Sequence, residues 1–141
     1  MKHTMEISGM RLLFDERLIL SDVYMKIETG DTVGLLGRNG CGKTCLMRGV
    51  YGTLECEKSV IIDNISVYEA YKKPSLIRYL PQHHFIPKYL TLKRVFRDFA
   101  VDFERFTEFF PVFQLWENTK IGHLSGGMHR LVELYVIIKS D

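Results

Sequence analysis

The sequence predicts an α/β fold, and three observations support this prediction. Short apolar runs separated by turn residues fill the first thirty residues, which is typical of antiparallel strands. A glycine-rich loop then stands between an apolar run and a segment compatible with a helix. In the second half, phenylalanines recur at helical spacing. The chain is therefore expected to combine a β region, an α/β core and a helical part.

The composition is that of an ordinary globular protein. The 141 residues are 46% hydrophobic and 26% charged, which suits one compact domain. A net charge of +2 without a long basic run gives no reason to expect nucleic acid as a partner. No apolar stretch is long enough to cross a bilayer, and the N-terminus lacks the apolar core of a signal peptide. Cys41, Cys45 and Cys56 have neither zinc-ligand spacing nor a partner CxxC pair, so we expect reduced thiols in a cytoplasmic protein.

The first half is predicted to be rich in strands. Three apolar runs are interpreted as antiparallel strands: residues 10–14, 18–20 and 23–27. The continuous apolar run at residues 32–36 is expected to be a strand buried on both faces, as in a parallel sheet. A helix should run from Lys43 to about Val50.

Further strands and a loop are predicted after this helix. Residues 60–62 are interpreted as a strand that ends in a turn at Asp63 and Asn64. Residues 76–80 are interpreted as another strand, and the polar stretch 69–75 between them as a loop.

Amphipathic helices are predicted in the second half. From Thr91 onward one amphipathic helix is predicted, ended by Pro111, because five phenylalanines recur at steps of three and four residues: Phe96, Phe99, Phe103, Phe106 and Phe110. Such a stripe could dock a partner, but this spacing is more typical of the core of a small helical subdomain, which is the interpretation that we adopt. Residues 128–139 follow two glycines and are predicted to be a helix with one apolar face, formed by Leu131, Leu134, Tyr135 and Ile138.

The glycine-rich loop carries a phosphate-binding motif. The residues Gly37-Arg38-Asn39-Gly40-Cys41-Gly42-Lys43-Thr44 fit GxxxxGK[ST], with an apolar run before and a helix-compatible run after. Glycines let backbone N–H groups turn towards phosphate oxygens, and the helix N-terminus favours the same anion. Lys43 adds a full positive charge, and the Thr44 hydroxyl is placed to bind Mg²⁺. The alternative is a chance glycine-rich turn.

The predicted nucleotide-binding residues of the loop are Gly37, Asn39, Gly40, Cys41, Gly42, Lys43, Thr44 and Cys45. Cys41 allows two interpretations. Its oxidation would place bulk and negative charge against bound phosphate, as in a redox switch. We favour the simpler interpretation, that Cys41 is a small residue tolerated in the loop, because no resolving cysteine is evident.

A second motif, Leu124-Ser125-Gly126-Gly127, distinguishes between the classes of protein that contain such a loop. With it, the sequence resembles the nucleotide-binding domain of ABC ATPases. The resemblance runs through nearly the whole chain, in the order Phe14-Asp15, Asp22-Val23, Gly30-Asp31, the P-loop, Gln82 and the LSGG. It implies a P-loop NTPase fold with an antiparallel β subdomain, a partial RecA-like parallel sheet core and an α-helical subdomain. The implied parts of this single domain (1–141) are the β region 1–30, the P-loop core 31–86, the helical subdomain 87–127 and the signature helix 128–141.

The resemblance also implies roles for individual residues, with ATP as the nucleotide. Phe14 matches the aromatic residue that stacks on adenine, although it could equally be a half-buried strand residue. Gln82 matches the Q-loop glutamine that reaches Mg²⁺ and the attacking water. Ser125, Gly126 and Gly127 match the signature residues that contact ATP held by the opposite subunit, so the complete site is expected in a homodimer or with a second ABC ATPase subunit.

The sequence departs from the family pattern at two points. Met128 follows the signature where the family usually has Gln or Glu. The Walker B Asp and the catalytic Glu are not found, so we assign no catalytic residue beyond the auxiliary Gln82 and expect the sequence to be truncated before the Walker B strand. Asp63 and Asp141 each follow an apolar run, but their contexts do not match Walker B. An unpaired edge beside the P-loop strand is expected.

The function implied by the resemblance is that of the ATP-binding subunit of an ABC transporter, which couples ATP hydrolysis to transport through transmembrane permease partners. Such a subunit would be cytoplasmic and peripheral on the inner face of the membrane. Partner contact is expected near His83, His84 and Phe85, where the histidines are interpreted as exposed loop residues, and at the helical subdomain. The alternatives are a soluble non-transport ABC ATPase, a non-catalytic ATP-binding fragment and, least favoured, a small P-loop phosphotransferase.

Overall fold

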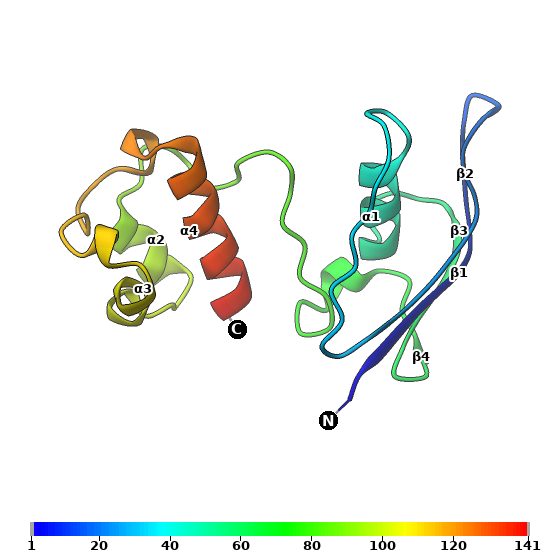
Figure 1. The fold of residues 1–141 in the computed structure, drawn as a ribbon, viewed down its shortest axis with the longest axis horizontal. Coiled ribbons are helices and arrows are strands. Elements are labelled where there is room, and N and C mark those ends of the chain that lie inside the picture. Colours follow the sequence, from blue (N-terminus) through cyan, green and yellow to red (C-terminus); the bar gives the residue numbers. More distant parts are fainter. Residues whose placement is uncertain (1, 141) are drawn as a thin grey trace. The chain divides into compact units, whose positions relative to one another are not determined.

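Residues 2–140 are described by the computed structural model, so Met1 and Asp141 lie outside the described residues. The chain divides after Ile77 into two units, each with its own buried core. The first unit is an antiparallel sheet with one helix, and the second is helical (Figure 1).

A long hairpin forms one half of the sheet in the first unit. Strand β1 (Thr4–Phe14) pairs antiparallel with β2 (Arg17–Glu28) through a two-residue turn. Both turn residues, Asp15 and Glu16, have positive φ values (43° and 68°), as the twist of a tight hairpin requires. The predicted antiparallel strands of this region are confirmed, but the second and third runs belong to a single strand with register shifts, not to two strands.

The other half of the sheet follows the helix. Strand β3 (Glu57–Ile62) pairs antiparallel with β1, and the short β4 (Ile65–Ser66) pairs with β3, giving the order β2-β1-β3-β4. The predicted strand and turn are thus confirmed. In the turn, Asp63 uses both carboxylate oxygens at the start of β1, accepting from Thr4 N at 2.9 Å and contacting His3 Nδ1 at 2.7 Å.

The helix predicted from Lys43 is confirmed as α1 (Lys43–Tyr51), which packs on the sheet and lies between two glycines in the left-handed conformation. Leu46, on its buried side, joins a core with sheet residues: Ile7, Met10, Leu12, Leu20 and Val60. At the other end, Gly52 closes the helix by donating its N–H to Arg48 O and Gly49 O. Helix α1 therefore begins and ends at positions that favour glycine.

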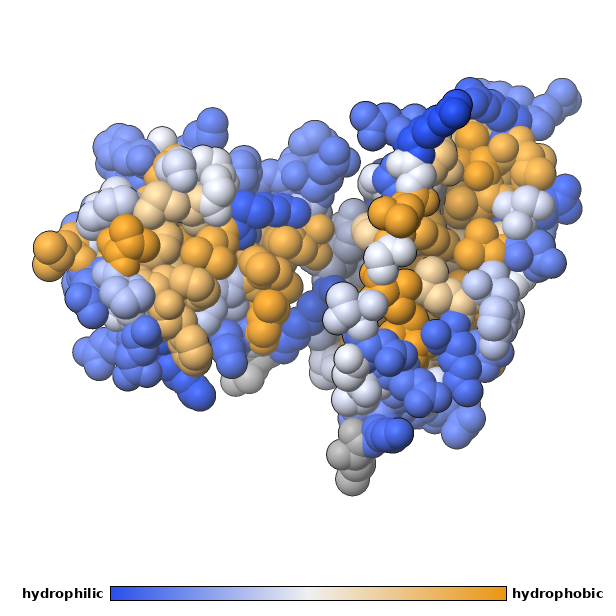
Figure 2. All heavy atoms as spheres, in the orientation of Figure 1, coloured by the Kyte–Doolittle hydropathy of each residue, from blue (hydrophilic) through white to orange (hydrophobic). Residues whose placement is uncertain are grey.

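Two predicted strands are not formed. Residues 32–36 and 76–80 have no strand structure, and Val33 and Leu36 are 50% and 94% exposed. Every strand pair among residues 2–140 is antiparallel, so no parallel neighbour is present to bond residues 32–36. A single strand cannot form its hydrogen bonds alone, and an apolar run remains extended and exposed without them. Figure 2 shows hydrophobic residues uncovered on the surface of the first unit.

Residues 69–75 were predicted to be a loop, and they contain one short 3-10 turn, η1 (Ala70–Lys72).

The second unit contains three helices and two short 3-10 turns. The helices are α2 (Leu92–Asp98), α3 (Phe103–Phe109) and α4 (Gly126–Lys139), and the turns are η2 (Pro111–Phe113) and η3 (Ile121–His123). The single helix predicted from the phenylalanine spacing is therefore wrong: the chain breaks at Ala100, whose φ is 52°. Asp102 then starts α3 by accepting from Arg105 N.

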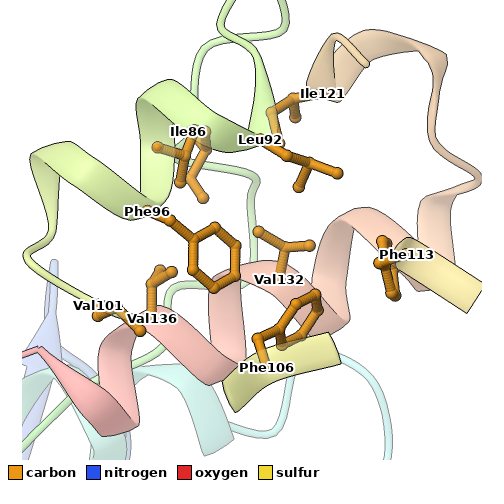
Figure 3. Close-up of a cluster of buried hydrophobic side chains, with 10 residues drawn as sticks. Ile86, Leu92, Phe96, Val101, Phe106, Phe113, Ile121, Val132 and Val136 are labelled. Carbon is orange, nitrogen blue, oxygen red and sulfur yellow. The ribbon is translucent and has the colours of Figure 1, made fainter. Parts of the chain in front are cut away.

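The phenylalanines nevertheless form a core, as the sequence predicted. Phe96, Phe106 and Phe113 are at most 1% exposed and lie together in the core (Figure 3). The ring centroid of Phe106 lies 4.8 to 5.1 Å from those of its aromatic neighbours Phe96, Phe110, Phe113 and Tyr135. Val132 and Val136 of α4 complete this core.

The helix predicted at residues 128–139 is confirmed as α4, but only half of the predicted apolar face is correct. Leu131 and Tyr135 are partly buried and pack against the core of the second unit. Leu134 and Ile138 are 41% and 57% exposed, whereas the buried face is formed by His129, Val132, Glu133 and Val136.

None of the described helices is both long and apolar enough to cross a lipid bilayer.

Replacing Phe106 by alanine is expected to destabilise the second unit by about 3–5 kcal/mol, because it leaves a cavity among four aromatic rings. Trp116, the single tryptophan, packs against Phe113 and reports on this unit in urea unfolding followed by fluorescence. Phe109→Ala is the matched control, because Phe109 is 62% exposed and its loss should change stability by less than about 0.5 kcal/mol. Equal effects of the two substitutions would contradict this account of the core.

Candidate functional site

The loop before α1 curls around the ammonium group of Lys43. Lys43 Nζ donates to the backbone carbonyls of Gly37 at 2.6 Å and Arg38 at 2.8 Å, and lies 3.8 Å from Cys41 Sγ. The N–H of Cys41 donates to Arg38 O at 3.3 Å. The charged ammonium group of Lys43 is thus enclosed by the backbone of the loop. It belongs to the first residue of α1, and the dipole at the N-terminus of a helix favours anions.

Two positions of this loop leave no room for a larger residue. Gly42 has φ 97° and starts α1, and a Cβ there would meet Ile19 Cγ2 of β2 at 3.0 Å. A Cβ on Gly37 would stand 2.5 Å from Cys41 Sγ. The backbone of the loop therefore lies against the Cys41 side chain and against β2. Glycine at these positions permits the tight backbone turn that a phosphate-binding loop requires.

The other predicted loop residues take different positions. Asn39, Gly40 and Cys41 are exposed at the loop, and Thr44 is exposed in the first turn of α1. Cys45 is partly buried and packs against the core of the first unit, so its side chain faces away from solvent. The structure thus places the ammonium group of Lys43 inside the loop and the Thr44 hydroxyl on the next residue, in the same turn of α1.

Phe14 lies at the end of β1, beside the hairpin turn, and is 46% exposed. Figure 1 shows that this turn and the loop before α1 reach the same end of the first unit. An exposed ring face is available there for stacking.

Gln82 and the signature residues belong to the second unit. Gln82 is exposed in an irregular segment, and Ser125 is the N-cap of α4, where its Oγ accepts from Met128 N at 3.3 Å. Gly126 and Gly127 are exposed, with open space where a side chain would be. The three residues present a helix N-terminus to solvent, which can bind an anion.

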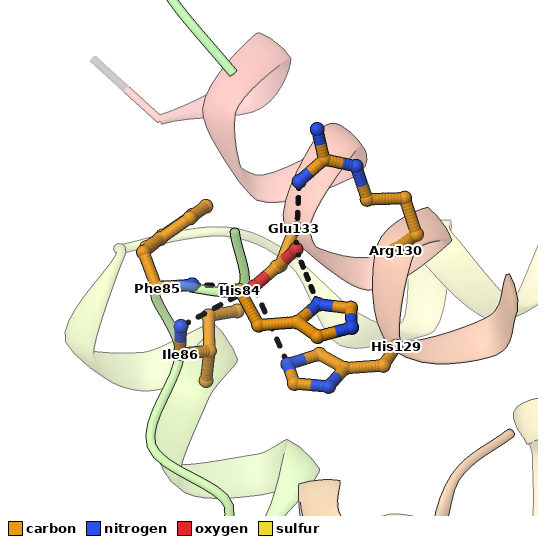
Figure 4. Close-up of polar contacts among 6 residues, drawn as sticks. All are labelled: His84, Phe85, Ile86, His129, Arg130 and Glu133. Atoms are coloured by element: carbon orange, nitrogen blue, oxygen red, sulfur yellow. Dashed lines mark hydrogen bonds and ion pairs between the residues drawn. The ribbon is translucent and has the colours of Figure 1, made fainter. Parts of the chain in front are cut away.

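The sequence analysis missed a buried carboxylate, Glu133. It is 0% exposed, and its Oε1 accepts from the backbone N–H groups of Phe85 at 2.8 Å and Ile86 at 3.3 Å. Its Oε2 contacts His84 Nδ1 at 3.0 Å and Arg130 Nη1 at 3.2 Å (Figure 4). The only signal in the sequence is a glutamate between apolar residues of α4, and the spacing of its neighbours does not indicate burial.

His129 completes this cluster. Its ring stacks on the ring of His84 with centroids 3.9 Å apart, and its Nε2 lies 3.3 Å from Glu133 Oε1 without hydrogen-bond geometry. His84 itself is exposed, as predicted for a loop residue.

The two ring systems and the carboxylate have the composition of a His₂Glu zinc site, with ligand atoms within 4.8 Å of one another. Both carboxylate oxygens already accept hydrogen bonds, and the Arg130 guanidinium supplies the opposite charge. The cluster is therefore a hydrogen-bonded anchor, and we assign no metal to it.

The environment shifts two pKa values in this cluster. Burial alone would raise the pKa of Glu133, but the hydrogen bonds from His84, Phe85, Ile86 and Arg130 outweigh it and hold that pKa below its ordinary value. Burial lowers the pKa of His129, against the attraction of Glu133. Glu133 is thus held charged and His129 neutral near pH 7.

Comparisons with known proteins point to one family. The family model described as ABC transporter matches residues 20–140. The chain is 29% identical over 137 residues to the ABC transporter ATP-binding protein YtrB of Bacillus subtilis (strain 168), covering 92% of this chain and 46% of YtrB. It is 35% identical over 79 residues to the manganese transport system ATP-binding protein MntB of Listeria innocua, covering 55% of this chain and 32% of MntB. The chain spans less than half the length of these relatives.

Two solved structures share the fold. One is the ATP binding subunit of an ABC transporter, with a TM-score of 0.71 at 20% identity, covering 94% of this chain and 60% of that one. The other is the ADP conformation of MJ1267, an ATP-binding cassette of an ABC transporter, also with a TM-score of 0.71 at 20% identity, covering 96% of this chain and 64% of that one. The predicted fold class, that of the ABC ATPase domain, is thereby confirmed, although no parallel strand pair forms among residues 2–140.

Lowering the pH from 7 to 5.5 is expected to destabilise the second unit through His129. Its folded pKa lies below its unfolded value near 6.5, so the unfolded chain binds the proton more readily and stability falls as pH drops below that value. Glu133 raises this pKa, whereas His84 and Lys88 lower it. Urea unfolding followed by Trp116 fluorescence at the two pH values measures the change.

The control is His129→Gln, which keeps a polar side chain of similar size but does not titrate. Its stability should depend less on pH over this interval than that of the unsubstituted chain. Equal pH dependence in both proteins would show that His129 is not the titrating group.

Proposed function

The chain belongs to the ABC transporter family, and on this basis we propose that it binds Mg·ATP as part of the ATPase subunit of an ABC transporter. The observation that carries the proposal is the closure of the glycine-rich loop around Lys43 Nζ. The two carbonyl oxygens hold the ammonium group where phosphate oxygens would be received. Lys43 then exchanges weak carbonyl partners for fully charged ones, which strengthens its hydrogen bonds.

The residues after Lys43 fit a magnesium ion. The Thr44 hydroxyl is exposed on the first turn of α1, one residue beyond the ammonium group. Mg²⁺ prefers oxygen ligands and, when bound, neutralises charge on the β- and γ-phosphates. Thr44 would supply one such oxygen, and Gln82 is proposed as a second contact to the metal and as the residue that orients water.

Phe14 and the signature residues are proposed to complete the nucleotide site. Phe14 offers an exposed ring for adenine. Ser125 Oγ accepts from Met128 N, which leaves its own proton free to be donated to a phosphate. Ser125, Gly126 and Gly127 would contact the ATP of a second subunit, so the functional unit is a homodimer or a pair with another ABC ATPase subunit.

The remaining parts of the proposal concern the whole protein. Relatives are named as ATP-binding proteins of transport systems, among them MntB and the sulfate/thiosulfate import protein CysA of Bordetella pertussis. We propose the corresponding arrangement here: ATP hydrolysis coupled to transport, transmembrane permease partners, and a location on the cytoplasmic face of the membrane. The parts proposed for the domain are those given above, from the β region 1–30 to the signature helix 128–141.

Replacing Lys43 by alanine is expected to weaken Mg·ATP binding about 10- to 100-fold, which corresponds to the loss of a charge-assisted hydrogen bond of about 1.5–3 kcal/mol. Titration of a fluorescent ATP analogue with the purified chain measures the affinity. Lys73→Ala, which removes an exposed lysine outside the loop, should bind as the unsubstituted chain does. Equal binding by all three proteins would refute the proposed site.

Phosphate release, measured in parallel, tests hydrolysis separately. Because we assign no catalytic carboxylate, the chain alone should bind ATP in a Lys43-dependent way with little turnover. Sustained Lys43-dependent turnover would show that a carboxylate of this chain has been overlooked.

A further inference from the structure

Glu133 joins the segment that follows Gln82 to the signature helix. The carboxylate projects from α4, and its Oε1 accepts the N–H groups of two consecutive residues, Phe85 and Ile86. These residues begin only three positions after Gln82. Two adjacent backbone amides on one buried oxygen fix both the position and the direction of the chain there.

The carboxylate is fully paired. His84 Nδ1 and Arg130 Nη1 occupy Oε2, and the side chain is 0% exposed (Figure 4). A buried charge is costly unless each oxygen has partners, and here each has two. A hydrophobic residue would pack into the same core but could not hold the amides. Packing alone therefore does not account for a glutamate at this position.

The same segment is also tied to the end of α4. Arg78 Nη1 donates to the carbonyl oxygens of Ile137, in the last turn of the helix, and of Ser140, its C-cap. Gln82 thus lies between two attachments to one helix, Arg78 before it and Phe85 after it. Segments held at both ends can move only with the element that holds them or by breaking an attachment.

Helix α4 carries the signature residues at its other end. Ser125 caps the helix, and Glu133 lies eight residues further along, about 12 Å at the α-helical rise per residue. A displacement of the Gln82 segment is therefore transmitted along one helix to Ser125, Gly126 and Gly127.

We propose that Glu133 is a positioning residue that makes the Gln82 segment and the signature helix move as one body when nucleotide binds. This inference rests on the proposed function, in which Gln82 responds to Mg·ATP. Glu133 touches neither nucleotide nor metal in it, and acts only through the backbone of Phe85 and Ile86.

Amide hydrogen exchange of the full chain, with and without Mg·ATP, tests the proposal. The variants are Glu133→Ala, Glu133→Gln and the control Val136→Ala, which opens a cavity on the same face of α4 without touching the anchor. In the absence of nucleotide, Glu133→Ala should raise the exchange rates of the Phe85 and Ile86 amides about tenfold or more, because these two buried amides lose their hydrogen-bond acceptor. In Val136→Ala, the exchange rates of these amides should rise no more than those of the other amides of the second unit.

Nucleotide supplies the second readout. In the unsubstituted chain and in Val136→Ala, Mg·ATP should change exchange at residues 83–86 and at residues 125–131 together. In Glu133→Ala the change at residues 125–131 should be lost while nucleotide affinity at Lys43 persists. Glu133→Gln keeps one carbonyl oxygen for the two amides, so it should retain part of the coupling, and it serves if Glu133→Ala does not fold.

Each outcome decides a separate question. Coupled changes of undiminished size in Glu133→Ala, or in Glu133→Gln if Glu133→Ala does not fold, would overturn the positioning role, as would equal local exchange in Glu133→Ala and Val136→Ala. Absence of Lys43-dependent binding in the unsubstituted chain would instead contradict the proposed function, and with it the nucleotide-linked movement. Exchange at Phe85 and Ile86 without nucleotide would then still decide whether Glu133 anchors the segment.

Discussion

The close packing of Gly42 against β2 is the constraint on which the candidate phosphate site depends. A Cβ at this position would stand 3.0 Å from Ile19 Cγ2 and 3.2 Å from Leu20 Cδ2, and the residue has φ 97°. Only glycine meets both conditions without strain. This contact places the N-terminus of α1 against the hairpin, and the helix places Lys43 under the loop. The hairpin, the helix and the loop thus form one framework.

In the second unit, the buried carboxylate of Glu133 is the corresponding constraint. The aromatic cluster around Phe106 fixes which face of α4 is buried, and Glu133 lies on that face. A buried carboxylate requires hydrogen-bond donors, and the backbone N–H groups of Phe85 and Ile86 supply them. Apolar packing therefore orients the helix, and the hydrogen bonds of one glutamate then order an irregular segment that has no secondary structure of its own.

Hydrogen bonds hold helix α4 at three positions along its length. Ser125 caps its start, Glu133 anchors its middle and Arg78 donates to its last carbonyls. The helix is thus fixed by hydrogen bonds at its start, middle and end, and by apolar packing of one face against the core. Such an element changes position as a rigid body more readily than it bends.

The sequence by itself determined the features that depend on local chemistry. The glycines and lysine of the loop, helix α1 and the strand and turn at Asp63 follow from short motifs with fixed backbone requirements. The phenylalanine spacing likewise predicted a helical core, although it could not show the break at Ala100, where a residue without glycine's freedom takes a φ of 52°.

Only the tertiary structure decided what depends on neighbours far along the chain. Residues 32–36 have the pattern of a buried strand, but a strand requires a hydrogen-bonding partner, and none of the described strands pairs with them. The buried face of α4 was likewise decided by the aromatic cluster, since Leu134 and Val136 are equally apolar in sequence but only Val136 meets it. The burial of Glu133 also depends on residues far along the chain. A glutamate is expected at the surface, and the backbone donors of Phe85 and Ile86 permit its burial.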